Sequence, residues 1–328
     1  MTKHALITGA TGQDGALLAK LLLDKDYKVF GMMRRTSSPT DWRLNELGVY
    51  DNKNFQSVSG DLTDSASLQR VMAISSPNEI YNLAAQSYVG ASWQNPISTM
   101  DITGMGAMRL YEAALHFQQD SGKQVKIYQA SSSEMFGNIK NNSANENETL
   151  YPRSPYGVAK CAAHLSAKTY RDSYGMFISC GILFNHESEY RGVEFVTRKI
   201  TLSAARISLG KQYELTLGNL ESKRDWGYAN DYIYAMYLML QQNTPDNFVI
   251  ATGKAHSILE FCKQSFDEVG LNWEKYVKID KNMIRPNDIN FLLGDSAKAK
   301  SELGWKPEVS FSQMITRMVS KDLVRESK

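Results

Sequence analysis

The chain has 328 residues, of which 42% are hydrophobic and 22% are charged, and its formal net charge is +2. This is an ordinary globular composition, with enough length for one large domain and a smaller one. A charge so close to zero argues against general binding to nucleic acid or to a membrane surface. A local basic site for a phosphorylated ligand is compatible with it.

The three cysteines, Cys161, Cys180 and Cys262, are far apart and form no C-x-x-C pair. They indicate buried thiols in a reducing compartment, and neither a disulfide framework nor a zinc site. No signal peptide precedes the first apolar run, and no run approaches the roughly 18 residues of a membrane helix. We therefore expect a cytoplasmic protein that does not enter a membrane.

Short apolar runs alternate with helical patterns in the first half of the chain. The segment Ala16–Leu22, for example, repeats apolar residues at three- and four-residue spacing. Such alternation predicts an α/β fold of the Rossmann type, a doubly wound parallel sheet with helices on both faces. The expected strands are His4–Thr8, Lys28–Arg34, Phe55–Ser59, Glu79–Ala84, Lys126–Ala130 and Phe177–Phe184, with Phe248–Thr252 returning to the sheet.

A glycine-rich segment, T-G-A-T-G-Q-D-G, follows the first strand directly. In a dinucleotide site one glycine allows a sharp turn, a second lets the backbone approach a pyrophosphate, and a third lets helix and strand pack closely. The amino end of the next helix offers free amides to the phosphates. A plain glycine turn is the alternative, but the place between a first strand and an amphipathic helix favours the cofactor. The candidate residues are Gly9, Ala10, Thr11, Gly12, Gln13, Asp14 and Gly15.

Arg34 and Arg35 stand at the end of the second strand. A protein that selects NAD places an Asp or Glu in this region to bind the ribose hydroxyls. Two arginines instead suit the 2′-phosphate of NADP, because guanidinium groups bind phosphate bidentately. A solvated basic turn is the alternative, and we predict NADP.

Two further strand ends are candidates for the cofactor site. Asp61 and Leu62, after the third strand, suit an adenine contact. The small residues after the fourth strand would let a cofactor lie close to the backbone, at the edge where open sheets bind ligands. The candidates there are Leu83, Ala84, Ala85, Gln86 and Ser87. Either segment alone is also compatible with a purely structural role.

The strand–helix alternation loosens from about Gly181. We expect residues 1–180 to form the NADP-binding domain. Residues 181–328 then form a mainly substrate-binding domain, with some segments returning to the first sheet. The polar segment Asn138–Glu148 is expected to be a loop at the border of the site.

The fifth strand ends in A-S-S-S-E, and Y-P-R-S-P-Y-G-V-A-K follows it. Tyr156 and Lys160 are four residues apart, so a helix places them on one face. A free tyrosine, with a pKa near ~10, is a poor base at neutral pH, and a nearby ammonium and a nicotinamide cation stabilise its phenolate. We expect Tyr156 to remove a hydroxyl proton, supported by Lys160, while Ser132 orients that hydroxyl. The spacing alone also occurs by chance.

Glu134 changes the expected reaction class. A simple alcohol dehydrogenase needs no carboxylate beside its serine. A dehydratase does, because oxidation at carbon 4 of a sugar acidifies the proton on carbon 5, which a base must then remove. A structural bond from Glu134 to a backbone amide is the alternative. No metal site is expected, since the histidines are scattered at His4, His116, His164, His186 and His256.

With these residues placed, the chain resembles the GDP-mannose 4,6-dehydratase family of extended short-chain dehydrogenases, nearly end to end. The stretches that carry the resemblance are T-G-A-T-G-Q-D-G, N-L-A-A-Q-S-Y-V-G-A-S-W, Y-P-R-S-P-Y-G-V-A-K, G-I-L-F-N-H-E-S, F-V-T-R-K-I, G-N-L-E-S-K-R-D-W-G and I-A-T-G. The resemblance implies an internal redox cycle that starts GDP-deoxysugar synthesis. NADP⁺ takes hydride from carbon 4, water leaves across carbons 5 and 6, and hydride returns to carbon 6.

The resemblance also implies roles for particular residues. Catalysis falls to Ser132, Glu134, Tyr156 and Lys160, and these residues, with Ser87, face the bound sugar nucleotide and cofactor. Asn185, Lys199, Arg224 and Arg285 hold the GDP part, with Asp288 near its ribose, and His186 and Arg191 line the cofactor. Family members are homodimers or homotetramers, so the implied partners are a GDP-sugar and copies of the same chain.

The sequence departs from the family pattern at three positions. Ser132 stands where threonine is usual, Glu189 replaces a proline, and Asp288 shortens a glutamate. Glu189 and the short polar segment from Asn138 leave a GDP-manno-heptose open as the substrate. A sugar-nucleotide 4-epimerase or 4-reductase is a more distant alternative, since those enzymes generally lack a glutamate at the position of Glu134.

Overall fold

The structure is a computed structural model that describes residues 2–139, 143–280 and 289–328. It forms two compact units, and the chain passes between them several times. Unit 1 consists of Met1–Met135, Ser154–Ile182 and Ile233–Phe248. Unit 2 consists of Phe136–Arg153, Leu183–Tyr232 and Val249–Lys328. Which unit binds which ligand stays a prediction.

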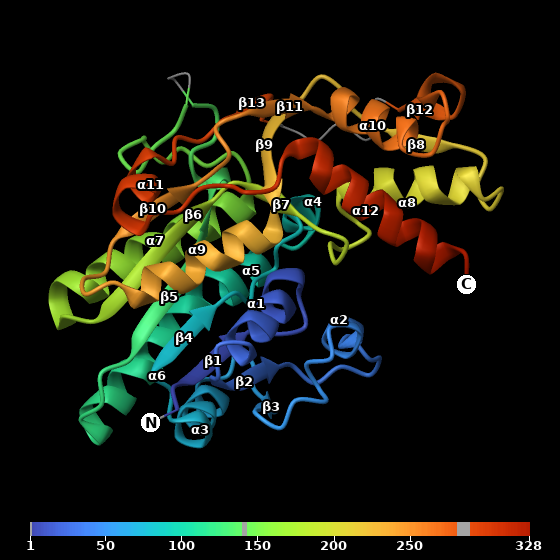
Figure 1. Cartoon of the computed structure of the whole chain (residues 1–328). Helices are drawn as coiled ribbons and strands as arrows, with labels where there is room; N and C mark the ends of the chain where they lie inside the picture. Colours follow the sequence, from blue (N-terminus) through green and yellow to red (C-terminus); the bar gives the residue numbers. More distant parts are fainter. Residues whose placement is uncertain (1, 140–142, 281–288) are drawn as a thin grey trace. The chain divides into compact units, whose positions relative to one another are not determined.

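A seven-stranded sheet, in the order β10-β6-β5-β4-β1-β2-β3, forms the core of unit 1 (Figure 1). The pairs β1–β2, β2–β3, β1–β4 and β4–β5 are parallel. The predicted doubly wound α/β fold is therefore confirmed, and the strand ends differ from the expected ones by a few residues. The strands are β1 (His4–Thr8), β2 (Lys28–Met33), β3 (Phe55–Ser59), β4 (Glu79–Asn82), β5 (Lys126–Ser132), β6 (Phe177–Leu183) and β10 (Asn247–Ile250).

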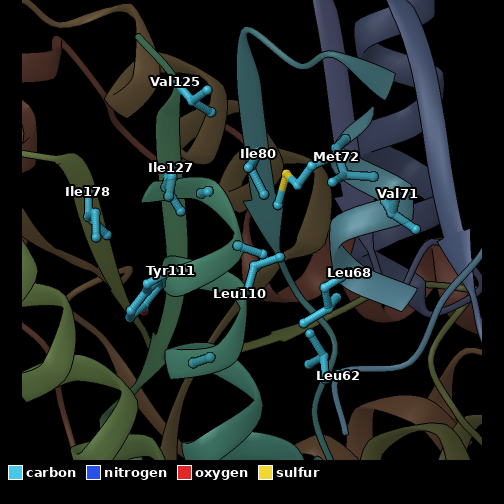
Figure 2. Close-up of a cluster of buried hydrophobic side chains, with 14 of the residues drawn as sticks. Leu62, Leu68, Val71, Met72, Ile80, Leu110, Tyr111, Val125, Ile127 and Ile178 are labelled. Atoms are coloured by element: carbon cyan, nitrogen blue, oxygen red, sulfur yellow. The ribbon is translucent and has the colours of Figure 1, made fainter. Parts of the chain in front are cut away.

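The helices α3 and α6 cover one face of this sheet with apolar side chains. Figure 2 shows Leu68 and Val71 of α3 and Leu110 of α6 beside Ile80 of β4 and Ile127 of β5. These side chains are all fully buried. Strands covered by helices on both faces read as continuous apolar runs, which is why the sequence pattern located them.

Local sequence explains where the main helices of unit 1 begin and end. Helix α7 starts at Pro155, after Ser154, whose hydroxyl accepts a bond from the Gly157 amide at 3.1 Å, and it ends before Gly175, which has φ +64°. The elements that follow the strands are α1 (Gln13–Leu23), α2 (Trp42–Glu46), α3 (Ser65–Ser75), α4 (Val89–Gln94), α5 (Pro96–Thr99), the π-helix η1 (Met100–Met105), α6 (Gly106–Ser121), the 3₁₀ helix η2 (Ser133–Met135), α7 (Pro155–Tyr174) and α9 (Ala229–Gln241).

Unit 2 has its own core, in which Trp226, Phe261 and Met318 are buried. The buried carboxylate of Asp322 on α12 binds Arg198 of α8, and Thr201 donates to it at 2.8 Å. The elements are β7 (Asn185–Glu187), α8 (Val196–Ser208), β8 (Leu215–Leu217), β9 (Lys223–Tyr228), β11 (Ala255–Ser257), α10 (Ile258–Asp267), the 3₁₀ helix η3 (Trp273–Lys275), β12 (Val277–Ile279), β13 (Phe291–Leu292), α11 (Ala297–Leu303) and α12 (Phe311–Glu326).

Candidate active site

Two positions of the glycine turn between β1 and α1 accept only glycine. Gly9 has φ +68°, and a Cβ there would lie 2.9 Å from the Cα of Ala84. A Cβ on Gly15 would lie 2.3 Å from the carbonyl oxygen of Gly9. The Gly12 amide closes the turn by donating to Gly9 O at 3.0 Å. The backbone is therefore bare where a pyrophosphate would approach it.

The residues around this turn fit a dinucleotide. Gly12 precedes the first residue of α1 and has no side chain to cap the helix, and an amino end of this kind is a favourable place for a phosphate. Ala10 is buried, and the Thr11 carbonyl accepts a bond from Arg43 at 3.1 Å. Gln13 is buried and donates to Asp14 at 2.9 Å. The turn is thus held rigidly from both sides.

Arg34 and Arg35 follow β2 directly, and both are exposed. Within the described part of the chain, neither side chain forms an ion pair. Their positive charge is thus available to an external anion. This is the arrangement that recognition of a 2′-phosphate requires.

The other strand ends place the remaining cofactor candidates of unit 1. Asp61 binds the amide and hydroxyl of Thr63 at 2.9 and 2.8 Å, and Leu62 is buried in the core. After β4, the amides of Leu83 and Ala84 donate to the Thr8 hydroxyl at 3.0 Å. Ala85 and Gln86 are half-buried, and Ser87 is exposed.

Lys160 is the best-defined of the candidate catalytic residues. Its ammonium donates to the carbonyl oxygen of Ala130 at 2.7 Å and lies 5.8 Å from the centre of the Tyr156 ring. Burial lowers the pKa of Lys160 to about 8, while the carboxylate of Asp14 acts in the opposite direction. Lys160 is therefore still mostly charged at neutral pH, inside an almost dry site.

Ser132 and Glu134 occupy one tight turn at the end of β5. The Ser132 hydroxyl accepts a bond from the Glu134 amide at 3.2 Å, Ser132 is buried, and Glu134 is half-buried. Helix α7, which carries Tyr156, packs against both β5 and this turn. The structure therefore brings the four predicted catalytic residues to neighbouring elements of unit 1.

Among the described residues, unit 2 contains five further candidates, and none of these five is fully buried. The His186 ring stacks on Tyr232 at 4.8 Å, and Arg191 pairs with the buried Glu187 at 3.1 Å. Lys199 donates to the carbonyl of Thr216 at 2.7 Å. Asn185 lies in β7 and Arg224 in β9. Arg285 and Asp288 lie outside the described residues.

Glu189, which departs from the family pattern, has a defined place in unit 2. The Tyr228 hydroxyl donates to its carboxylate at 3.2 Å, and Arg325 of α12 donates to its carbonyl oxygen. Burial and this carboxylate raise the pKa of Tyr228 to about 12. Glu189 thus ties the segment before Arg191 to the body of unit 2.

Two polar residues of this region had no role in the sequence interpretation. Gln129 is buried and donates to Ala130 O, the same atom that binds Lys160. His164, one turn after Lys160 on α7, lies 2.8 Å from the Ser131 hydroxyl, and burial lowers its pKa to about 4. The four-residue spacing from Lys160 was the one available signal for His164. Nothing in the sequence pointed to Gln129.

Two searches for other kinds of site were negative within the described part of the chain. No cluster of histidine, cysteine or acidic residues there could hold a metal ion. Of the described helices, none is long and apolar enough to cross a bilayer.

The glycine turn and the Tyr156/Lys160 helix on a parallel sheet define an enzyme of the extended short-chain dehydrogenase type. A solved dTDP-glucose 4,6-dehydratase from Streptomyces venezuelae with NAD bound shares this fold, with a TM-score of 0.85 and 24% identity, over 98% of this chain and 97% of that one. The protein RMD from Pseudomonas aeruginosa, solved with NADPH, matches with a TM-score of 0.79 and 21% identity, over 98% and 100% of the two chains.

Comparison with known sequences is more specific. The profile of the family described as GDP-mannose 4,6 dehydratase matches residues 6–318. The chain is 48% identical to GDP-mannose 4,6 dehydratase 1 of Arabidopsis thaliana, over 98% of this chain and 90% of that protein. It is 44% identical to GDP-mannose 4,6 dehydratase of Homo sapiens, over 97% and 91%. The chain belongs to the GDP-mannose 4,6-dehydratase family.

Proposed function

We propose that this protein converts GDP-D-mannose to GDP-4-keto-6-deoxy-D-mannose with a bound pyridine nucleotide. The observation that carries the proposal is the meeting of Tyr156 and Lys160 on one helix with Ser132 and Glu134 on the turn against which it packs. Family membership favours this reaction over the two alternatives. These are the dehydration of a GDP-manno-heptose and the 4-epimerisation or 4-reduction of a sugar nucleotide.

The protein's own residues divide the chemistry among them. Tyr156 takes the proton of the sugar 4-hydroxyl, which Ser132 orients, and the Lys160 ammonium stabilises the phenolate. When bound, the cofactor would accept a hydride from carbon 4 and return the same hydride to carbon 6. Between these transfers Glu134 removes the proton from carbon 5, and the 6-hydroxyl leaves with a proton as water. A proton finally returns to carbon 5. Because the hydride taken from carbon 4 ends on carbon 6, no cofactor is consumed.

The experiment that tests this function uses GDP-mannose in deuterated water, with mass analysis of product and recovered substrate. The wild type should give a product 18 mass units lighter than substrate, apart from deuterium gained at carbon 5. Glu134→Gln should still reduce the cofactor but form no product and exchange no carbon-5 proton. The matched control is Glu302→Gln, on the exposed face of α11, which should behave as wild type. If Glu134→Gln exchanges that proton at the wild-type rate, Glu134 is not the base.

For the cofactor we propose NADP in preference to NAD. The exposed Arg34 and Arg35 supply the charge for its 2′-phosphate, and the bare glycine turn accommodates its pyrophosphate. His186 and Arg191 of unit 2 are the further residues we assign to it. The double variant Arg34→Ala, Arg35→Ala should lose affinity for NADP while its affinity for NAD changes little. Wild-type protein that binds NAD at least as tightly as NADP contradicts the assignment.

For the substrate we propose that Asn185, Lys199 and Arg224 hold the GDP part, with Arg285 and Asp288 of the segment outside the described residues. Arginine and lysine suit a diphosphate, because both donate charged hydrogen bonds. Ser87, on the exposed strand end, is assigned to the sugar.

We propose that the protein is a cytoplasmic homodimer or homotetramer. Val158 and Leu165, seven residues apart on α7, expose 44% and 53% of their surface, and nearby Met105 exposes 43%. Such a stripe of apolar side chains beside the active-site helix suits contact with a second copy. The free, buried cysteines suit a reducing compartment. Light scattering after size exclusion should give the mass of two or four chains, and a monomer contradicts the proposal.

A further inference from the structure

A row of buried polar side chains crosses three neighbouring strands beneath the active site. Thr8 of β1 stands opposite Asn82 of β4, and Asn82 stands opposite Gln129 of β5. Residues paired in this way point to the same face of a sheet, so their side chains meet. All three are at most 3% exposed. Polar groups buried so completely are nearly always hydrogen-bonded.

The direction of each hydrogen bond in the row follows from its first member. The Thr8 hydroxyl accepts from the amides of Leu83 and Ala84, so its single proton goes to Asn82 Oδ1, at 2.8 Å. The Asn82 amide group therefore presents its NH₂ to Gln129 Oε1, also at 2.8 Å.

The row ends at the acceptor of Lys160. Gln129 Oε1 is occupied by Asn82 and by the Tyr111 hydroxyl, at 2.6 Å, so Gln129 Nε2 donates to Ala130 O at 3.0 Å. That oxygen is the one that Lys160 binds at 2.7 Å. Strand β4 ends at Asn82, opposite Gln129, so the next residue of β5, Ala130, has no paired residue in β4. On the side of β4, the Gln129 side chain therefore holds this carbonyl.

We propose that Gln129 is a positioning residue for Lys160, holding the Ala130 carbonyl, and through it the ammonium, in place as the last link of the row. This proposal rests on the catalytic role proposed for Lys160. Gln129 Nε2 and Lys160 Nζ both donate to the Ala130 oxygen, so the row acts on Lys160 through the position of the carbonyl. It also joins the cofactor-binding end of β4 to the catalytic helix.

Other charged groups near Lys160 have to be distinguished from this effect. Tyr156 precedes it by one turn on α7, and Asp14 in the first turn of α1 favours its charged form. His164, one turn later, is engaged with Ser131 and is neutral at working pH. Substitutions at Gln129 leave all three in place.

The test is an NMR titration of protein labelled at lysine ¹³Cε, in which the Lys160 signal is identified by its loss in Lys160→Met. Gln129→Met no longer holds the Ala130 carbonyl in place, so this oxygen should stabilise the ammonium less well and the Lys160 midpoint should fall by about half a pH unit, a roughly threefold loss of proton affinity. Gln129→Glu keeps the acceptor for Asn82 and Tyr111 and places a carboxylate near the ammonium, so its midpoint should rise.

The matched control is Tyr81→Phe, which removes the bond from Tyr81 to Glu79, at 2.9 Å, one residue before Asn82 on the same strand. It should leave the Lys160 midpoint unchanged. Should Gln129→Met be unfolded, Gln129→Glu decides alone. A Lys160 midpoint that is unchanged or lower in Gln129→Glu overturns the proposal. So does a midpoint that falls as far in Tyr81→Phe as in Gln129→Met.

The titration needs no substrate, so it can succeed or fail independently of the proposed function. An inactive wild type would overturn the function and leave the titration intact. In an active enzyme, the alkaline limb of the kcat profile should move in the same direction as each midpoint. If the alkaline limb of the kcat profile stays in place in both Gln129→Met and Gln129→Glu, Gln129 is not a positioning residue.

Discussion

Lys160 of unit 1 and Lys199 of unit 2 make the same bond in different surroundings. Each ammonium donates to a backbone carbonyl at 2.7 Å, that of Ala130 for Lys160 and that of Thr216 for Lys199. Burial lowers the pKa of Lys160 to about 8, and it also lowers the pKa of Lys199. The two bonds match in length, but Lys160 is buried whereas Lys199 is half-buried, so the two charges differ in how far they are removed from water.

This difference in burial suits the two roles proposed for these lysines, catalysis for Lys160 and binding of a diphosphate for Lys199. A catalytic group acts through electrostatics that are strong only where water is excluded, and it must be held before the substrate arrives. A residue that recognises a diphosphate needs reach and charge, and it keeps both at a wetter site. We therefore expect variants of the buried catalytic groups of unit 1 to change kcat or stability, and variants of the diphosphate-binding residues of unit 2 to change KM.

The largest expected effect is that of Tyr156→Phe. It removes the group that takes the sugar proton, and loss of a general base typically costs about 10² to 10⁴ in rate. Single-turnover formation of reduced cofactor measures this step. The control is Tyr174→Phe, at the exposed end of the same helix, which should keep the wild-type rate. Near-normal turnover by Tyr156→Phe would place the base elsewhere.

Acid should destabilise unit 1 through His164. Its pKa is about 4 in the folded protein against 6.5 for a free side chain, so its contribution is present above pH 6.5 and is lost as pH falls through 4. The lowered pKa corresponds to about 3 kcal/mol. Urea unfolding between pH 7 and 4 should show this loss in wild type and a shallower one in His164→Gln. His116→Gln, at an exposed position, should match wild type, and equal slopes in all three would exclude His164.

Lys160→Met should inactivate the enzyme and yet stabilise it. The folded pKa of about 8 lies below the usual 10.5, so burying the charged form costs about 3 kcal/mol at neutral pH, a cost that disappears as pH rises to 10.5. The lost bond to Ala130 offsets part of the gain, which leaves about 2 kcal/mol. Urea unfolding at pH 7 measures it. A destabilised Lys160→Met would mean that burial is not the dominant influence on this lysine.

The smallest effect is expected for Lys199→Met. Loss of one charged contact to a diphosphate should raise KM for the GDP-sugar about tenfold, or about 1.4 kcal/mol, with little change in kcat. Initial rates over a range of substrate concentrations separate the two constants. Lys300→Met, exposed on α11, is the control. A fall in kcat at unchanged KM would remove the distinction between the two units.

The sequence by itself determined the sheet strands, the glycine turn and the Tyr156/Lys160 helix. These features are local, because a β-strand buried on both faces, a turn that only glycine can adopt and a four-residue helical spacing are each written within a few residues. Family membership followed from the same stretches. Chemistry that depends on residues close together in the chain can therefore be predicted from the sequence.

Only the tertiary structure decided which distant groups support that chemistry. The row from Thr8 to Gln129 depends on the register of three strands that are far apart in sequence, and the bond from His164 to Ser131 depends on how α7 packs on β5. The passage of segments 136–153 and 233–248 between the units is another example. Such contacts form when the chain closes on itself and buries polar groups that must then find partners, a condition that no short stretch of sequence encodes.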